Sequence, residues 1–144
     1  MKSKLVLVGI MAVVSLGLLA CSSVPSQVPV EVSCDDFYEQ SAISREATVA
    51  VGDSFTVTLC SNPTTGFQWS ESAQISDQTV LEQVDSRFVS PQSEPPPPPG
   101  TPGQRIWTFQ ALKAGDSTVS LDYSRPWEGG EKGTWTFVLT VTVK

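Results

Sequence analysis

Short runs of alternating apolar and polar residues fill the second half of this chain, which is the pattern of half-buried β-strands. The clearest run is the last, in which Trp135, Phe137, Leu139, Val141 and Val143 alternate mostly with threonine. The same alternation predicts other strands at residues 54–60, 106–111 and 119–123, beginning at 67, within 79–89 and around 47–51. We find no convincing helical period and expect an all-β domain.

Gly, Pro, Asn and Asp separate these runs, as expected for turns between strands. About seven short strands in a domain of roughly 110 residues favour an immunoglobulin-like, two-sheet antiparallel β-sandwich over a barrel. We expect Val80, Val84 and Phe88 to face inward within the less regular strand. Three tryptophans fall on strands and are assigned to the core: Trp69, Trp107 and Trp135.

Three turn-rich stretches interrupt the strand pattern, at residues 62–67, 100–103 and 125–130. If each strand between them reverses direction, one extra strand separates each stretch from the next, and all three emerge at the same end of the sandwich. The sequence therefore predicts one composite surface built from three loops. Trp127 lies in the last of them, between a proline and a glycine-rich polar segment.

The N-terminus has the features of an export signal. Lys2 and Lys4 precede a fifteen-residue apolar run, residues 5–19, which is shorter than the roughly 20 residues that a membrane-spanning helix needs. The tetrapeptide Leu18-Leu19-Ala20-Cys21 resembles the lipobox of bacterial lipoproteins, in which the cysteine is acylated after cleavage. Ser22 follows the cysteine, and the absence of Asp at this position resembles lipoproteins that are sorted to an outer membrane.

This reading divides the chain into a signal peptide at residues 1–20, a flexible tether at 21–34 and a folded domain at 35–144. The tether is rich in Ser, Pro, Gln and Val without a helical period. We expect an extracytoplasmic protein that is anchored to a bacterial membrane by a lipid on Cys21, the outer membrane in a Gram-negative cell.

The charge balance argues against one class of partner. Fifteen acidic and nine basic side chains give a net charge of −6, and removal of residues 1–20 takes away two of the lysines. Nucleic-acid binding requires clustered Lys and Arg, so we expect no nucleic-acid partner. The acidity either favours basic partners or serves solubility alone.

Two cysteines remain when Cys21 is set aside. Cys34 and Cys60 either form a disulfide, which an exported compartment permits, or remain two buried free thiols. A disulfide would close a loop of about 25 residues and stabilise the fold by roughly 3 kcal/mol. It would join the N-terminal segment to the end of a strand.

Five consecutive prolines, Pro95 to Pro99, favour an extended segment and suggest either a linker or a stiff loop. The segment after Gly103 has 41 residues, near the lower limit of about 40 for an independent domain. We therefore place the prolines in a long loop within one domain.

Enzymatic chemistry has little support in this sequence. The chain contains no histidine, which excludes Ser-His-Asp and Cys-His nucleophile pairs and the usual zinc ligand sets. No glycine-rich phosphate loop opens a helix, and the acidic residues lie in segments expected to be solvated. We expect no enzyme activity, no cofactor and no metal.

The turn-rich stretches carry motifs in a specific order. They are Asn62-Pro63-Thr64-Thr65-Gly66-Phe67, then Gly100-x-x-Gly103 before Trp107-Thr108-Phe109-Gln110-Ala111, then Tyr123-x-Arg125-Pro126-Trp127-Glu128. Together they resemble the chagasin family of cysteine-protease inhibitors over about residues 49–144. The resemblance implies an immunoglobulin-like sandwich whose three loops block the cleft of papain-like enzymes. The protease-binding residues that it implies are Asn62, Pro63, Thr64, Thr65, Gly66, Phe67, Gly100, Gly103, Arg125, Pro126 and Trp127.

The residue types suit such a role. Pro63 fixes its φ angle and Gly66 permits conformations that other residues avoid, so the first loop is shaped before it binds. Thr64 and Thr65 are narrow and polar, as a slot lined by hydrogen-bonding groups requires. Trp127 is a natural interface anchor. Arg125 either contacts the protease or holds its own loop through an acidic neighbour or a carbonyl group.

These observations predict a monomeric, reversible, non-covalent inhibitor of papain-like cysteine proteases. The alternative is an envelope binding module that recognises peptidoglycan, carbohydrate or a surface protein through the same loops. The long proline run, the leader and the extra cysteines depart from the family pattern.

Overall fold

The computed structural model describes residues 28–144. The predicted signal peptide, the lipobox and its Cys21, and most of the predicted tether lie outside the described residues. Within residues 28–144, no helix has the length and apolar character that crossing a membrane demands.

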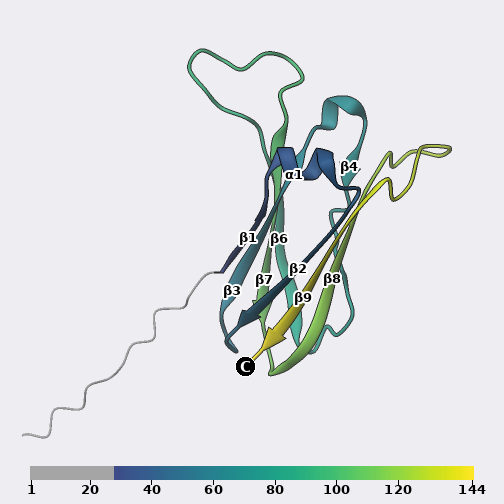
Figure 1. The fold of residues 1–144 in the computed structure, drawn as a ribbon. Coiled ribbons are helices and arrows are strands. Elements are labelled where there is room, and N and C mark those ends of the chain that lie inside the picture. The colour runs from purple at the N-terminus through teal and green to yellow at the C-terminus, as the bar shows by residue number, and fades with distance from the viewer. Residues whose placement is uncertain (1–27) are drawn as a thin grey trace, which may run out of the picture.

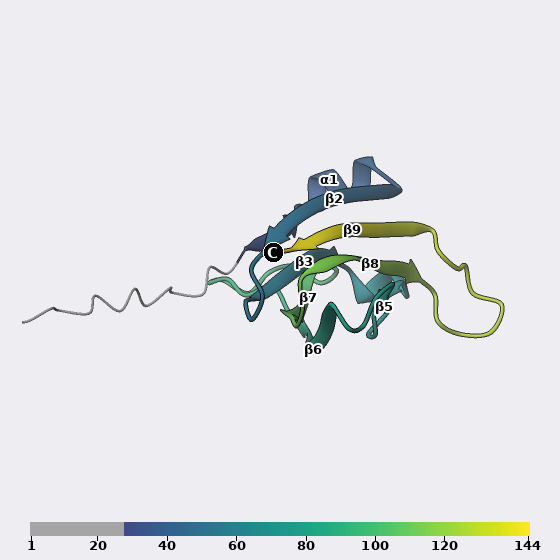
Figure 2. The same ribbon diagram turned by 90° about the horizontal axis from the view of Figure 1, so that it is seen from below.

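Two β-sheets packed face to face form the domain (Figures 1 and 2). The first has the strand order β1-β3-β7-β6, and the second has the order β2-β9-β8-β4, with β5 also paired to β8. The elements in chain order are β1 (Pro29–Val32), α1 (Cys34–Glu39), β2 (Ala42–Val49), β3 (Ser54–Ser61), the 3-10 turn η1 (Pro63–Thr65), β4 (Gln68–Trp69), β5 (Gln74–Ile75), β6 (Leu81–Val89), β7 (Gly103–Ala111), β8 (Gly115–Ser124) and β9 (Trp135–Val143).

The all-β sandwich predicted from sequence is confirmed, with two corrections to its details. Among the described residues there are nine strands instead of about seven, because β1 lies in the predicted tether and the two-residue strand β5 is too short to show an alternating pattern. The sheets are also mixed instead of purely antiparallel. β1 pairs with β3 in parallel, and β2 pairs with β9 in parallel.

The N-terminal segment differs most from the expectation. Residues 29–32 form β1 within the predicted tether, and α1 is a helix where none was expected. Ser33 begins this helix as its N-cap, accepting a hydrogen bond of 3.1 Å from the backbone N–H of Asp36. Six residues are too few for helical periodicity to appear in a sequence. α1 carries the chain from one sheet to the other at the loop end (Figure 1).

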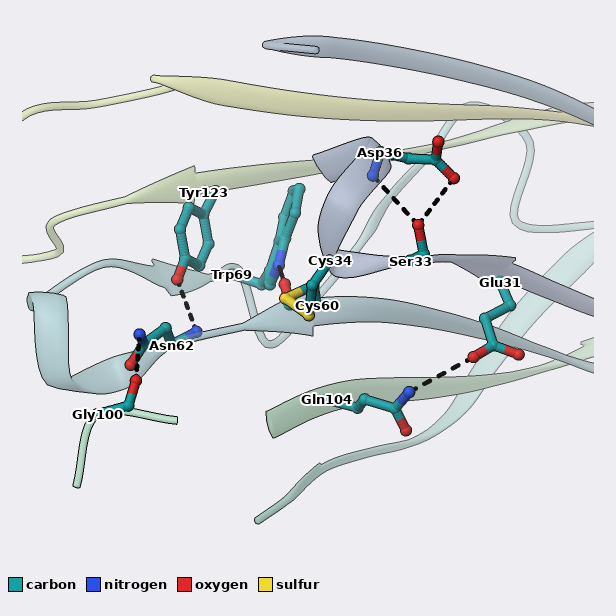
Figure 3. The surroundings of a disulfide bond; sticks show 10 residues. All are labelled: Glu31, Ser33, Cys34, Asp36, Cys60, Asn62, Trp69, Gly100, Gln104 and Tyr123. Atoms are coloured by element: carbon teal, nitrogen blue, oxygen red, sulfur yellow. Dashed lines mark hydrogen bonds between the residues drawn. A yellow bond between two sulfur atoms is a disulfide. The ribbon is translucent and has the colours of Figure 1, made fainter. Parts of the chain in front are cut away.

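A disulfide joins Cys34 at the start of α1 to Cys60 near the end of β3, with 4.9 Å between their Cα atoms (Figure 3). Of the alternatives left open by the sequence, the structure contains the cross-link and not the two free thiols. The bond connects the N-terminal segment to the strand that leads into the first turn-rich stretch.

The core lies between the two sheets and follows the predicted alternation closely. Phe55, Val57 and Leu59 of β3 are buried, and so are Val119, Leu121 and Tyr123 of β8. In β9, Phe137, Leu139, Val141 and Val143 are buried, whereas Trp135 is partly buried and packs against the core. Trp69 and Trp107 are in the core as predicted.

The predicted inward face of β6 is partly wrong. Val80 is buried, but Val84 and Phe88 are 51% and 37% exposed. The pairing between β6 and β7 shifts register between Gln83 and Asp85, and this irregularity disrupts the alternation of faces that a regular strand would have.

Candidate functional site

Three connecting loops project from one end of the sandwich, at the top of Figure 1, while the C-terminus lies at the other end. We name them the first loop (residues 62–67), the middle loop (residues 90–102) and the third loop (residues 125–134). Each follows a strand that runs toward this end: β3, β6 and β8. The three turn-rich stretches therefore lie at one end, as predicted from strand reversal.

The first loop is a single 3-10 turn closed by its own backbone. The N–H of Gly66 donates to the carbonyl of Pro63 at 2.9 Å, and the hydroxyl of Thr65 donates to the carbonyl of Asn62 at 2.7 Å. Gly66 has φ of 80°, a left-handed conformation that favours glycine. Pro63, Thr64 and Thr65 are exposed at the tip. The turn thus presents two threonines on a locally hydrogen-bonded frame.

Asn62 connects the first loop to the middle loop. Its side-chain amide donates to the carbonyl of Gly100 at 2.9 Å (Figure 3). Its side-chain oxygen accepts from the hydroxyl of Thr64 at 2.5 Å. Its backbone N–H donates to the hydroxyl of Tyr123 at 2.9 Å. One residue therefore bonds the middle loop, the tip of its own loop and the core beneath.

Tyr123 supports this arrangement from below. Its ring is buried among Phe37, Phe67, Trp69 and Trp135, at centroid distances between 4.9 and 5.8 Å. Burial disfavours the phenolate and raises the pKa of Tyr123 above its ordinary value, although the hydrogen bond from the Asn62 N–H opposes that shift. The hydroxyl remains protonated at neutral pH and accepts the loop's backbone N–H.

Arg125 connects the third loop to the first. Its guanidinium lies 4.5 Å from the centroid of the Phe67 ring and donates to the carbonyl of Thr65 at 3.4 Å. It also forms an ion pair of 3.3 Å with Glu131 in its own loop. Both alternatives named for its structural role, an acidic neighbour and a carbonyl, are present together. The Arg125 side chain thus braces two loops against each other.

Trp127 lies over the first loop and is 51% exposed. A methyl group added at Gly66 would come within 2.5 Å of the indole Cη2 atom. The indole ring therefore occupies the space that a side chain at position 66 would fill. Lys132 donates to the carbonyls of Arg125 and Trp127 at 2.6 and 2.8 Å and holds the third loop in its turn. The indole is therefore positioned on one side and open to solvent on the other.

The middle loop approaches the first loop near Gly100. The side-chain hydroxyl and the backbone N–H of Thr101 both donate to the carbonyl of Pro98, at 2.7 and 3.2 Å, which fixes the turn after the prolines. Pro95, Pro96, Pro98 and Pro99 are exposed and Pro97 is partly buried. The proline run belongs to a loop of the single described domain, as the size argument predicted.

The predicted site residues do not all reach the surface. Phe67 is 8% exposed and stacks on Tyr123, and Gly103 is buried in β7, where an added methyl group would lie 2.4 Å from the carbonyl of Val89. These two residues shape the loops from beneath. Six of the predicted residues are exposed at the loop end: Pro63, Thr64, Thr65, Gly100, Pro126 and Trp127.

Sequence reasoning did not assign a site role to Tyr123, Glu131 or Lys132. Tyr123 ends the strand predicted at residues 119–123, and a tyrosine hydroxyl that is buried usually has a hydrogen-bond partner. The Lys132 contacts depend on the path of the loop, for which the sequence carries no comparable signal. Within residues 28–144, no group of three or more potential metal ligands comes together.

Comparisons with known proteins agree with this geometry. The family model described as "Chagasin family peptidase inhibitor I42" matches residues 48–141. The chain is 37% identical to chagasin of Trypanosoma cruzi over 84 residues, covering 57% of this chain and 74% of that protein. It is 27% identical to amoebiasin-2 of Entamoeba histolytica over 96 residues, covering 67% of this chain and 75% of that protein.

Two solved structures share the fold. The crystal structure of the cysteine protease inhibitor EhICP2 from Entamoeba histolytica matches with a TM-score of 0.57 and 22% identity, over 72% of this chain and 94% of that one. PbICP-C, solved in complex with falcipain-2, matches with a TM-score of 0.55 and 14% identity, over 81% of this chain and 98% of that one.

Proposed function

Because the chain belongs to the chagasin family of peptidase inhibitors, we propose that it inhibits papain-like cysteine proteases reversibly, by occluding the active-site cleft with its three loops. Two relatives support this target: EhICP2 is described as a cysteine protease inhibitor, and PbICP-C was solved bound to falcipain-2. The chain has no histidine to activate a nucleophile, and inhibition by occlusion requires none.

One observation carries the proposal: the first loop is bonded to both of the other loops before any partner is present. Asn62 bonds the middle loop, and Arg125 bonds the first loop from the third. A surface that is already shaped loses less conformational entropy on docking, which favours tight binding. The pre-formed loop end is therefore suited to plugging a cleft.

Each exposed part has a distinct task in this proposal. Thr64 and Thr65, at the narrow tip of the first loop, enter the catalytic centre and leave the protease thiolate without a scissile bond to attack. Trp127 covers the cleft on one side and buries its open face against the protease. The middle loop around Gly100 flanks the tip on the other side.

Steady-state kinetics with papain test the proposal. A soluble form comprising residues 22–144 is expected to raise the apparent KM of a peptide substrate without lowering kcat, and removal by dialysis is expected to restore full activity. Absence of inhibition at micromolar concentration contradicts the assignment. A complex with papain that survives denaturation contradicts a non-covalent mechanism.

We further propose that a lipid on Cys21 holds this inhibitor at a bacterial membrane. The lipobox-like tetrapeptide before Cys21 supports this proposal. Mass spectrometry of the protein isolated from its native membrane tests it. A mass corresponding to residues 21–144 plus acyl groups is expected, and an unmodified mature chain contradicts the anchor.

A further inference from the structure

The strand that leads into the first loop receives an unusual set of contacts just before the loop begins. Cys60 is cross-linked to Cys34, and its carbonyl accepts a hydrogen bond of 2.8 Å from the indole N–H of Trp69. Two residues later, the N–H of Asn62 donates to Tyr123. Figure 3 shows these three connections converging on the end of β3.

A single aromatic side chain lies behind both hydrogen-bonding rings. Phe37 of α1 is 1% exposed, with its ring centroid 5.1 Å from that of Tyr123 and 5.7 Å from that of Trp69. Its ring is nearly perpendicular to Tyr123, at 88°, which is a favourable edge-to-face arrangement. Phe37 therefore packs against the two rings that hold the backbone on either side of Ser61.

The segment that supplies Phe37 is attached to β3 by strand pairing and by the disulfide. β1 pairs in parallel with β3 from Pro29↔Thr56 to Val32↔Leu59, and the disulfide follows immediately. This segment, residues 29–40, precedes the stretch matched by the family model, which begins at residue 48. Its buried Phe37 side chain contacts Tyr123 and Trp69, whose hydrogen bonds hold the strand that leads into the first loop.

We propose that residues 29–40 act as a positioning element for the first loop. The disulfide fixes α1 on β3, α1 inserts Phe37 behind Tyr123 and Trp69, and those rings fix the backbone from Cys60 to Asn62. Phe37 is a positioning residue that does not touch the protease. This inference rests on the proposed inhibition for its consequence, but the loop geometry itself is measured without a protease.

Amide hydrogen exchange of the full-length protein, alone in solution, provides that measurement. The substitution Phe37→Leu removes the ring but retains an apolar side chain, so the fold is preserved. We expect exchange at Asn62 and Gly66 to accelerate at least tenfold. Cys34→Ser combined with Cys60→Ser is a second variant that releases the same element, and we expect it to accelerate the same amides.

Phe55→Leu is the matched control. Phe55 is also a fully buried phenylalanine with an aromatic partner, Phe109, but it lies at the start of β3, at the opposite end of the domain. We expect this variant to lower the melting temperature by a similar amount while leaving exchange at Asn62 and Gly66 within twofold of wild type. Equal loop exchange in the Phe37→Leu and Phe55→Leu proteins at matched stability overturns the proposal.

Inhibition of papain supplies the functional readout. We expect Phe37→Leu to weaken inhibition about tenfold, mainly through faster dissociation, and Phe55→Leu to leave it unchanged. If Phe37→Leu and Phe55→Leu weaken inhibition equally, the positioning role is wrong although the protein is an inhibitor. If wild type does not inhibit papain, the proposed function fails, and the exchange data still decide the positioning role.

Discussion

The two ends of this sandwich differ in their bonds: the end opposite the loops uses backbone groups as well as side chains such as that of Ser117, whereas the loop end joins its loops through side chains. At the end opposite the loops, backbone groups join the turns: the N–H of Gly52 donates to the carbonyl of Ala111 at 2.8 Å, and the N–H of Leu112 donates to the carbonyl of Val80 at 2.8 Å. At the loop end, the bonds between neighbouring loops come from side chains, those of Asn62 and Arg125.

This difference shows how one fold separates stability from recognition. Most single substitutions leave backbone hydrogen bonds in place, so the structure of the far end tolerates changes of side chain. Side-chain bonds depend on residue identity, so the shape of the loop end depends on a few residues. Substitutions at the loop end are therefore expected to alter inhibition, and matched substitutions at the far end to alter stability alone.

The largest effect is expected from Thr65→Asp combined with Trp127→Ala. A carboxylate forced into a protease cleft without a partner costs several kcal/mol, and truncating a tryptophan anchor costs about 2 kcal/mol or more. Together they are expected to raise the inhibition constant for papain by roughly a thousandfold, since each 1.4 kcal/mol is tenfold.

The far-end control for that variant is Val51→Asp combined with Leu112→Ala, at two exposed apolar positions. It is expected to inhibit papain like wild type. Inhibition that survives the loop-end double substitution would contradict the role of the loops and favour the alternative of a carbohydrate or surface-protein binding module.

A pair of glycines gives a closer comparison. Gly66 and Gly52 have φ angles of 80° and 87°, so alanine at either position is strained by roughly 1–2 kcal/mol. Only at Gly66 does the new methyl group meet Trp127, whereas nothing lies within 4 Å at Gly52. Gly66→Ala is expected to weaken inhibition by about thirtyfold or more through the displaced indole.

Gly52→Ala is expected to lower the melting temperature as much as Gly66→Ala and to keep full inhibition. Thermal denaturation and inhibition kinetics on the two proteins check both statements. Equal inhibition constants for the two variants would show that the position of Trp127 over Gly66 has no role in binding.

A smaller effect is expected from Asn62→Ala. This change removes the bond to Gly100 and leaves the hydroxyl of Thr64 without its acceptor, which releases two loops at a cost of about 1 kcal/mol per bond. Inhibition is expected to weaken about tenfold. Ser117→Ala, which removes a hydroxyl that accepts from the N–H of Asp77 at the far end, is expected to change stability and not inhibition.

The smallest effect concerns the pH dependence of the free energy of unfolding. The loop end is expected to lose stability at high pH and the far end at low pH. The raised pKa of Tyr123 means that its stabilising contribution is complete below about pH 10 and is lost as pH rises through the folded pKa. At the far end, a hydrogen bond from Thr79 lowers the pKa of Asp77. The stabilising contribution of the Asp77 carboxylate is present above about pH 4 and is lost as pH falls.

Urea unfolding across pH checks this assignment. Tyr123→Phe is expected to flatten the alkaline decline in the free energy of unfolding and leave the acid limb unchanged. Asp77→Asn is expected to flatten part of the acid decline and leave the alkaline limb unchanged. An unchanged alkaline limb in the Tyr123→Phe protein would contradict the burial argument for its pKa.

The sequence predicted those parts of the molecule that follow from local pattern. The alternation in β3, β8 and β9 identified their buried faces, and strand reversal predicted that the loops share one end. The same reasoning failed at Val84, because a register shift is a property of two paired strands, and at α1, because six residues show no period.

The candidate site was predicted to a similar extent. The residues that form the exposed tip could be named from turn chemistry and the family resemblance. The buried positions of Gly103 and Phe67, and the support of the first loop by Tyr123, depend on which strands are neighbours, and sequence alone does not fix strand order. Arg125 was correctly given a structural alternative because its guanidinium suits both carboxylates and carbonyls.

Hydrogen exchange of the protein with and without bound papain tests the central claim most directly, namely that three loops act as one occluding surface. The account predicts slowed exchange at residues 64–67, 100–103 and 127–130 together, with unchanged exchange at residues 50–53 and 112–116. Protection of the far end, or protection of only one loop, would contradict it.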